Sequence, residues 1–170
     1  MKFLNILAIT LLLSACGFHP QGAMHLTPAM QHLYIKTSDP YGHLTRYLEQ
    51  TLKMSGVQIA SSPQQATVLL DIINEKADQE LTGVSGTQQT RQYNFTLQVT
   101  YQLTDNKGNI LIEPQTISET RTIPIQANQT LGGSNEASSQ YQQMRRSITQ
   151  SILTRLSSKD VTTRLSKLTK

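Results

Sequence analysis

The sequence predicts an α+β two-layer sandwich, in which a four-stranded mixed sheet carries two helices on one face in the order β-α-β-β-β-α. Three observations lead to this prediction. Residues 93–103 alternate strictly between apolar and polar side chains, which is the period of a strand buried on one face only. Two other segments, residues 41–52 and 141–156, repeat apolar residues at helical spacing. Each helix has a single apolar stripe, so both are expected to pack on the sheet.

The first strand and the first helix are expected between residues 31 and 56. Three consecutive apolar residues predict a short strand at Gln31–Thr37. Ser38 or Asp39 is expected to cap the helix that follows, because Pro40 is tolerated at a first helical position. Gly56 is expected to end the helix in the left-handed conformation. The predicted apolar stripe of this helix consists of Tyr41, Leu44, Leu48 and Leu52.

Two strands are expected in the middle of the chain. Residues 66–73 are apolar at alternate positions and partly apolar between them, which predicts a strand in the centre of the sheet. Between Asp78 and Thr90 the pattern gives way to Gly, Ser and Gln, which indicates either a flexible connection or the tip of a long hairpin. The alternating strand at residues 93–103 then presents Asn, Thr and Gln on its second face.

The last strand and the second helix complete the predicted order. Residues 105–109 form a hairpin turn, with Gly108 available for a positive φ. Residues 110–112 and 117–125 would return as a strand, which Pro114 and Pro124 restrict to an edge or bulged position. Residues 126–139 are of low complexity and are expected to form a loop. The second helix is expected at residues 139–156, with an apolar stripe of Tyr141, Met144, Ile148, Ile152 and Leu156.

The composition predicts a single domain with an unusually neutral surface. The length of 170 residues fits one domain. Charged residues make up 15% of the chain, against about 25% in an average globular protein, so Gln, Thr, Ser and Asn must cover the surface. Soluble proteins usually carry more charge than this. A neutral polar surface favours a protein that lies against another polar surface.

The charge balance argues against a dedicated nucleic-acid-binding protein, because the formal net charge is only +4. Seven of the basic residues lie from Arg145 onward, where Asp160 is the only acid. This basic segment is interpreted either as a solvated helix face or as a contact for an anionic partner. Residues 157–170 are set apart as a basic C-terminal tail, which either continues as a helix or is ordered only by a partner.

The N-terminus predicts a secreted lipoprotein. Residues 1–15 have the features of a signal peptide, namely a basic residue at Lys2 and an apolar run too short to span a membrane. The run ends in Leu13-Ser14-Ala15-Cys16, a lipobox in which Cys16 is the residue that would be lipidated. Several acyl chains anchor a protein stably to a membrane. Residues 16–30 are expected to be the lipidated tether, and Gly17, in place of the Asp that retains lipoproteins in the inner membrane, favours the outer membrane.

No pattern in the sequence predicts catalysis, a metal site or a cofactor. Cys16 is the only cysteine, so no disulfide can form within the chain. The four histidines, His19, His25, His32 and His43, lack the spacing of helical metal ligands. The acids are sparse, and none is evidently paired for acid–base chemistry. The chain is therefore not expected to be an enzyme.

Several of these features together resemble the LptE family of lipopolysaccharide-assembly lipoproteins, also called rare lipoprotein B. The resemblance rests on Cys16-Gly17-Phe18-His19 after the lipobox and on the segment from Ser38 to Arg46 at the first helix. The helix that ends near Gly56, the alternating strand and the final helix follow in the order of the family. The resemblance implies that residues 31–156 form a plug domain within the lumen of the outer-membrane β-barrel LptD.

The same resemblance implies a role in carrying lipopolysaccharide to the outer leaflet. In the family, basic residues near the tips of the sheet contact lipopolysaccharide. The corresponding segments here, residues 83–90 and 126–139, contain no basic residue, so Arg91 and Arg121 are the nearest candidates for pairing with lipid A phosphates. An alternative stays open, namely a lipoprotein free on the periplasmic side that binds a small ligand or a lipid as a transport auxiliary.

Overall fold

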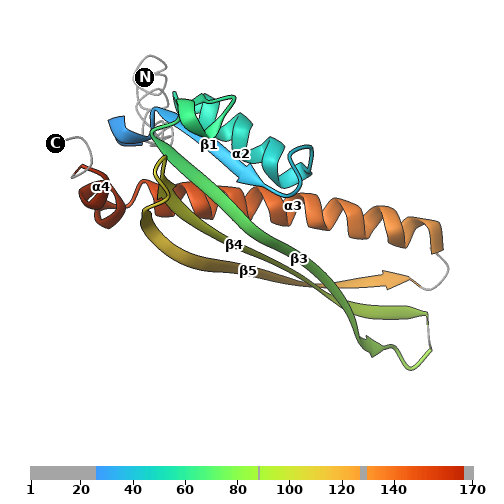
Figure 1. Ribbon diagram of the computed structural model, residues 1–170. Coiled ribbons are helices and arrows are strands. Elements are labelled where there is room, and N and C mark those ends of the chain that lie inside the picture. Colours follow the sequence, from blue (N-terminus) through green and yellow to red (C-terminus); the bar gives the residue numbers. More distant parts are fainter. Residues whose placement is uncertain (1–25, 88, 127–129, 167–170) are drawn as a thin grey trace, which may run out of the picture.

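The computed structural model describes residues 26–87, 89–126 and 130–166, which form one mixed sheet with helices on one face (Figure 1). Residues 1–25, which include Cys16, lie outside the described residues, as do residues 88, 127–129 and 167–170. In chain order, the elements are η1 (Pro28–Met30), β1 (His32–Thr37), α2 (His43–Met54), β2 (Gln58–Ile59), η2 (Pro63–Gln65), β3 (Val68–Val84), β4 (Thr90–Asp105), β5 (Ile110–Gln126), α3 (Thr130–Leu156) and α4 (Lys159–Leu165).

The sheet confirms the predicted fold class and adds one strand to it. Its five strands lie in the order β2-β1-β3-β4-β5. The pairs β1–β2 and β1–β3 are parallel, whereas β3–β4 and β4–β5 are antiparallel. The additional strand, β2, has only two residues, which is too short to produce a hydrophobic period. As predicted, β3 is central at its start, where Val68–Ile72 lies between β1 and β4.

The core lies between the sheet and the two long helices, which cover the same face (Figure 1). The large side chains of β4 that point toward the helices, including Phe95 and Tyr101, are fully buried. α2 contributes Leu44, Leu48 and Leu52, whereas Tyr41, predicted for the same stripe, is exposed because it precedes the helix. The buried apolar residues of α3 are Met144, Ile148, Ile152, Leu153 and Leu156.

α2 begins at His43, later than the predicted cap at Ser38 or Asp39. The residues before it form a turn, in which the Asp39 carbonyl accepts hydrogen bonds from the Gly42 amide at 3.2 Å and the Thr45 hydroxyl at 2.8 Å. Gly42 is extended, and a Cβ on it would lie 2.5 Å from Asp39 Oδ2, so a larger residue there would have to displace the exposed Asp39 side chain. The helix ends as predicted, with Gly56 at a φ of 83°.

α3 begins at Thr130, so the predicted loop at residues 126–139 is wrong over most of its length. Two adjacent glycines and several small polar residues made this segment look irregular. Once a helix is nucleated, however, each further residue adds a hydrogen bond, and Glu136 and Ala137 favour the helical state. The packed helix from Tyr141 onward therefore extends toward the N-terminus despite Gly132 and Gly133.

β3 and β4 form a long hairpin, so of the two interpretations of residues 78–90 the hairpin tip is correct. The strands are paired from Val68 to Val84, and the Ser85 amide donates to the Thr90 carbonyl at 2.8 Å across the tip. β5 is the edge strand, as Pro114 and Pro124 predicted. Its pairing with β4 is irregular near Leu103. Gly108 has the expected positive φ, at 88°.

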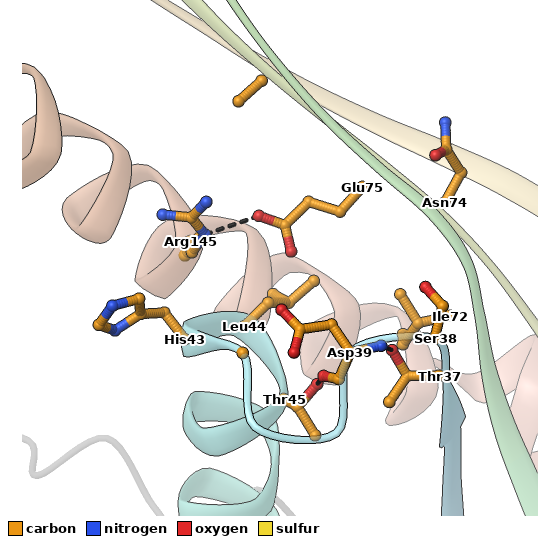
Figure 2. Close-up of a pocket in the computed structure, with 12 residues that line it drawn as sticks. Thr37, Ser38, Asp39, His43, Leu44, Thr45, Ile72, Asn74, Glu75 and Arg145 are labelled. Carbon is orange, nitrogen blue, oxygen red and sulfur yellow. Dashed lines mark hydrogen bonds and ion pairs between the residues drawn. The ribbon is translucent and has the colours of Figure 1, made fainter.

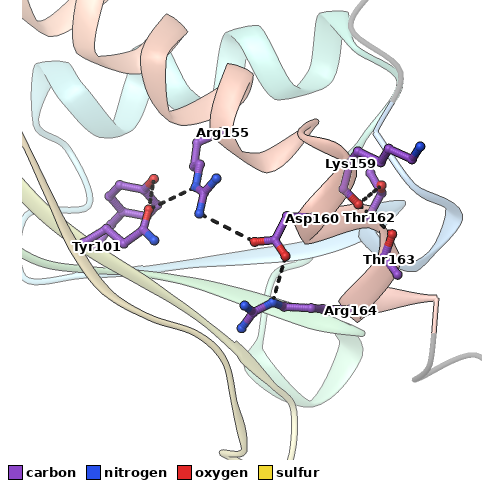
Figure 3. Close-up of polar contacts among 8 residues, drawn as sticks. Tyr101, Arg155, Lys159, Asp160, Thr162, Thr163 and Arg164 are labelled. Atoms are coloured by element: carbon purple, nitrogen blue, oxygen red, sulfur yellow. Dashed lines mark hydrogen bonds and ion pairs between the residues drawn. The ribbon is translucent and has the colours of Figure 1, made fainter.

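The start of the basic tail forms a helix that packs on the core. In α4, Val161 and Leu165 are buried against the core, so the helical interpretation holds for this segment. Asp160 lies between two arginines, 3.7 Å from the Arg155 guanidinium of α3 and 3.3 Å from Arg164 Nε (Figure 3). One cation of the tail, Arg164, is therefore engaged within the molecule, as is Arg155 just before it.

The turn after β4 makes the stability of this fold depend on pH. The pKa of Asp105 is lowered, chiefly by a hydrogen bond from the Asn109 side-chain amide, with further help from the amides of Lys107 and Asn109. Because this pKa is lower in the folded state than in the unfolded state, the ionised carboxylate stabilises the fold at pH values above the ordinary pKa of 3.8. This contribution is lost as the pH falls through the lowered pKa. We expect Asp105→Asn to remove this contribution, which denaturant unfolding between pH 2 and pH 7 would measure.

Asn109→Ala is the matched control because it removes the main donor and keeps the carboxylate. We expect this variant to show a weaker pH dependence than the wild type, with the loss of stability moved toward higher pH. If all three proteins lose stability in parallel as the pH falls, the turn does not contribute to the acid sensitivity.

Candidate interaction surface

The sheet face opposite the helices is a neutral polar surface, which we call the open face. Threonine hydroxyls pair across β4 and β5, at 3.2 Å between Thr96 and Thr120 and at 2.8 Å between Thr100 and Thr116. Thr122 donates to the Asn94 side-chain oxygen at 2.6 Å. These cross-strand contacts align the side chains in rows. The open face can therefore exchange hydrogen bonds with another polar surface without burying many charges.

The charges on the open face lie mainly along β3. Lys76, Asp78 and Glu80 occupy alternate positions in its second half, after a register shift at Ile73. Nearer the start of the sheet, Asp71 accepts from Lys36 Nζ at 2.9 Å and from the Gln102 amide at 3.1 Å. The ion pair of Lys36 with Asp71 and the hydrogen bond from Gln102 thus link β1, β3 and β4 across the open face.

The far end of the sheet presents an apolar tip on the helix side. Leu81 pairs with Tyr93, and Tyr93 pairs with Ile123 on the next strand. The next row joins Val84, Arg91 and Ile125. Leu81 and Val84 are 49% and 52% exposed, so this end of the sheet combines accessible apolar side chains with one cation. We call these two rows the apolar tip.

Arg91 and Arg121, the two predicted lipopolysaccharide contacts, differ in their surroundings. Arg91 is exposed in the apolar tip, and none of the ion pairs among the described residues includes it. Arg121 is engaged on the helix side, where its guanidinium lies 2.7 Å from Glu119 and donates to the Gln143 side-chain oxygen of α3 at 3.1 Å. Arg121 is paired opposite Phe95, four residues from Arg91 along β4, so the arginines are about 13 Å apart along the strands.

An ion pair and a tyrosine join α3 to the second half of β3, which extends beyond its pairing with β1. Arg145 Nε lies 2.6 Å from Glu75 Oε1 at the side of a cavity of about 350 Å³ between β3 and the start of α2 (Figure 2). The Tyr141 hydroxyl donates to the Asp78 carbonyl at 2.6 Å, and its ring packs edge-on against Phe95. Asp39 and His43 line the other side of the same cavity.

Burial raises the pKa of two tyrosines whose hydroxyls donate hydrogen bonds within the molecule. Burial raises the pKa of Tyr141, the Asp78 carboxylate raises it further, and Arg145 opposes the shift. Burial also raises the pKa of Tyr101, against the effect of Arg155. The Tyr101 hydroxyl and Arg155 Nε both donate to the Gln115 side-chain oxygen, which fastens β5 to α3 (Figure 3). These hydroxyls have structural partners.

The described residues offer neither a metal site nor a membrane-spanning helix. Within residues 26–87, 89–126 and 130–166, no three His, Cys, Asp or Glu side chains come close enough to hold a metal ion. No helix of that part is both long and apolar enough to cross a membrane. His32 and His43 lie on separate elements, and His19 and His25 lie outside the described residues.

The sequence reasoning missed the apolar tip and the contacts between Glu75 and Arg145. The sequence did contain a signal for the tip. Ala77 and Leu81 are apolar and four residues apart, so they lie on the same face of a strand. The shift at Ile73 reverses the alternation, however, so residues 68–73 do not indicate which face these side chains take. The ion pair joins residues 70 positions apart, and nothing local marks them as partners.

The comparisons with known proteins agree on one family. The family model described as "LptE: Lipopolysaccharide-assembly" matches residues 30–156. A protein named LPS-assembly lipoprotein LptE from Yersinia enterocolitica is 33% identical over 100 residues, covering 58% of this chain and 48% of the relative. A protein of the same name from Pectobacterium atrosepticum is 29% identical over 97 residues, with coverages of 56% and 53%. The chain thus spans about half the length of these curated relatives.

Solved structures confirm the fold. Rare lipoprotein B from Shewanella oneidensis superposes with a TM-score of 0.66 at 21% identity, covering 76% of this chain and 96% of that one. A minor lipoprotein from Acinetobacter baumannii gives a TM-score of 0.61 at 22% identity, with coverages of 75% and 91%. At these identities the likeness concerns the fold alone.

The different surroundings of the two arginines predict different effects on stability. Arg121→Gln would leave Glu119 half-buried without its cation, so we expect a loss of about 1 kcal/mol in the free energy of unfolding. Arg91→Gln changes an exposed side chain, and we expect the free energy of unfolding to stay within about 0.5 kcal/mol of the wild type. Urea unfolding of both variants would measure the difference, and equal losses would contradict the assignment of Arg121 as a structural residue.

Proposed function

Because the chain belongs to the LptE lipopolysaccharide-assembly family, we propose that it is an outer-membrane lipoprotein that plugs the β-barrel LptD and helps it to assemble. Cys16 is the proposed site of lipidation, which would hold the protein at the periplasmic side of the membrane with its folded domain in the barrel lumen. In this position the protein assists the delivery of lipopolysaccharide to the outer leaflet. Residues 31–156 are the proposed plug domain, and they carry no proposed catalytic role.

The open face is the observation that carries this proposal. The interior of a transmembrane barrel is polar and wet, so a plug must satisfy hydrogen bonds there. Thr, Ser, Asn and Gln side chains can donate to and accept from a barrel wall, and burying them costs much less than burying unpaired charges. The rows of paired polar groups provide such a surface along residues 94–100 of β4 and 116–122 of β5. We infer that the open face lies against the wall.

The apolar tip supports a direct contact with lipopolysaccharide. Lipid A combines phosphate groups with acyl chains, so a site for it needs a cation beside apolar surface. Arg91 provides a guanidinium that can pair with a phosphate through two hydrogen bonds. Leu81, Val84 and Ile125 offer apolar area next to it. Arg121 is engaged with Glu119 and Gln143, so Arg91 is the better candidate of the two.

We expect the C-terminally tagged protein to copurify with a large β-barrel from outer membranes dissolved in mild detergent. A photoreactive amino acid at Gln98, exposed in the middle of the open face, should crosslink to that barrel. The matched control is the same amino acid at Gln150, exposed on the outer side of α3, where we expect less crosslinking. Mass spectrometry of the adducts identifies the partner.

Two outcomes would contradict this prediction in different ways. Equal crosslinking from both positions would reject the open face as the wall-facing surface while keeping the plug. A protein that purifies without any barrel would reject the plug itself. That result would favour the alternative, a free periplasmic-facing lipoprotein that binds a small ligand or a lipid as a transport auxiliary.

We expect Arg91→Gln to weaken the binding of purified lipopolysaccharide about fivefold, the loss of roughly 1 kcal/mol from one charged hydrogen-bonded contact. Lys107→Gln is the control, because Lys107 is an exposed cation in the turn at the opposite end of β4. Fluorescence titration with labelled lipopolysaccharide would measure both affinities. If the two variants lose equal affinity, binding depends on overall charge and the tip is not the site.

A further inference from the structure

Three exposed charges lie along the second half of β3 on the open face. They occupy alternate positions of the strand and are Lys76, Asp78 and Glu80. We call these three side chains the charged row. β1 pairs with β3 only as far as Ile72, so the charged row lies along one margin of the open face (Figure 1). A partner that covers this margin would meet ions there instead of hydroxyls.

The charged row has no counter-charges within the part of the molecule that the structure describes. Across the ladder, its members lie opposite neutral side chains of β4, which are Gln98, Thr96 and Asn94. None of the ion pairs among the described residues includes a member of the row. Asp71, nearer the start of the same strand, differs because Lys36 Nζ lies 2.9 Å from its carboxylate. The charged row is thus left for water or for a partner.

A neutral partner surface would match this margin of the open face poorly. Taking an unpaired ion out of water costs far more free energy than burying a hydroxyl or an amide that finds a hydrogen bond. The hydroxyl rows of β4 and β5 can therefore lie against any polar wall. The charged row can be covered only where the wall supplies opposite charges, since like charges or missing partners are strongly unfavourable. In a barrel lumen, this requirement restricts how the plug is rotated.

The spacing of the charged row fits a strand of a barrel wall. Alternate residues of a strand point to the same face and lie about 6.6 Å apart. A barrel strand likewise directs alternate side chains into the lumen. The two repeats are therefore equal wherever the wall strand runs along β3, and three consecutive lumen-facing residues can meet the three members of the row.

We propose that the charged row binds a wall strand whose lumen-facing side chains are acidic opposite Lys76 and basic opposite Asp78 and Glu80. This contact rests on the proposed plug function and adds the chemistry of the wall to it. Complementary charges contribute more to specificity and register than to affinity. The charged row thus sets the orientation of the plug, whereas the neutral rows of the open face supply most of the contact area.

Exchanging the two ends of the row tests the contact. Lys76→Glu combined with Glu80→Lys reverses the order of the charges and keeps the net charge of the protein. Because two like-charge contacts would replace two ion pairs, we expect the amount of barrel that copurifies with the tagged lipoprotein to fall about tenfold. The matched control, Glu49→Lys with Lys53→Glu, exchanges the members of a surface ion pair on α2 and should copurify like the wild type.

Thermal unfolding of the isolated variants separates a lost contact from a lost fold. All members of the charged row are exposed, so we expect the K76E/E80K variant to unfold at the temperature of the wild type. If the exchange leaves copurification unchanged, or lowers it no more than the α2 exchange does, the charged row does not meet charges on the wall and the proposal is overturned.

Crosslinking from the middle of the row tests the wall strand directly and does not depend on the exchange. A photoreactive amino acid at Asp78 should crosslink to a lumen-facing residue, which mass spectrometry of the adduct identifies. We expect the lumen-facing neighbours on either side of that residue to be one acid and one base. Reversing both of these charges in the barrel should restore copurification of the K76E/E80K variant. Neutral neighbours, or no rescue, would overturn the proposal.

The charged row and the plug fail in different ways. A wild-type protein that copurifies with a barrel and crosslinks to it from Gln98, but shows no effect of the charge exchange, would keep the plug and reject the contact of the charged row. A wild-type protein that purifies without any barrel would reject the plug, and the wall contact with it.

Discussion

The one-sided burial of β4 under α3 is the interaction on which the rest of the structure depends. Phe95, Leu97, Val99, Tyr101 and Leu103 are all fully buried, and the residues between them stay at least partly exposed. Because side chains alternate along a strand, one register satisfies all five contacts and a shift by one residue would expose them together. The neighbours β3 and β5 take their register from this strand through long antiparallel ladders. The hydrophobic effect on one face thus sets the position of every side chain on the other.

The polar character of the open face follows from this arrangement. Because the two long helices, α2 and α3, cover the same face of the sheet, the second face must be satisfied by polar side chains, by water or by a partner. On β4 and β5 the chain uses Thr, Asn and Gln there instead of Lys and Glu, and the hydroxyl pairs between these strands hold the groups in fixed rows. A surface ordered in this way loses little side-chain entropy when it meets a partner. This is the property that makes it suitable as a contact surface in a polar lumen.

The sequence predicted the parts of the fold that depend on local periods and on single backbone conformations. The alternation of β4, the stripes of α2 and α3 and the positive φ at Gly56 and Gly108 are of this kind. Features that depend on particular contacts were not predictable. The start of α2 depends on a local turn closed by the Asp39 carbonyl, and the ion pair of Glu75 with Arg145 joins residues 70 positions apart. Arg91 and Arg121 looked alike because both lie on alternating strands. Only the proximity of Gln143 and Glu119 to Arg121 distinguishes this structural arginine from the exposed Arg91.

The two open edges of the sheet are protected against further strands in different ways. The second half of β3 carries three charged residues on its open face, which discourage another strand from pairing with it. β5 carries Pro114 and Pro124, which have no amide hydrogen to offer, and the ion pair between Glu119 and Arg121. Because both edges discourage pairing, a partner of the sheet is met through the side chains of its open face. The hydroxyl rows of β4 and β5 are the groups placed to make those hydrogen bonds.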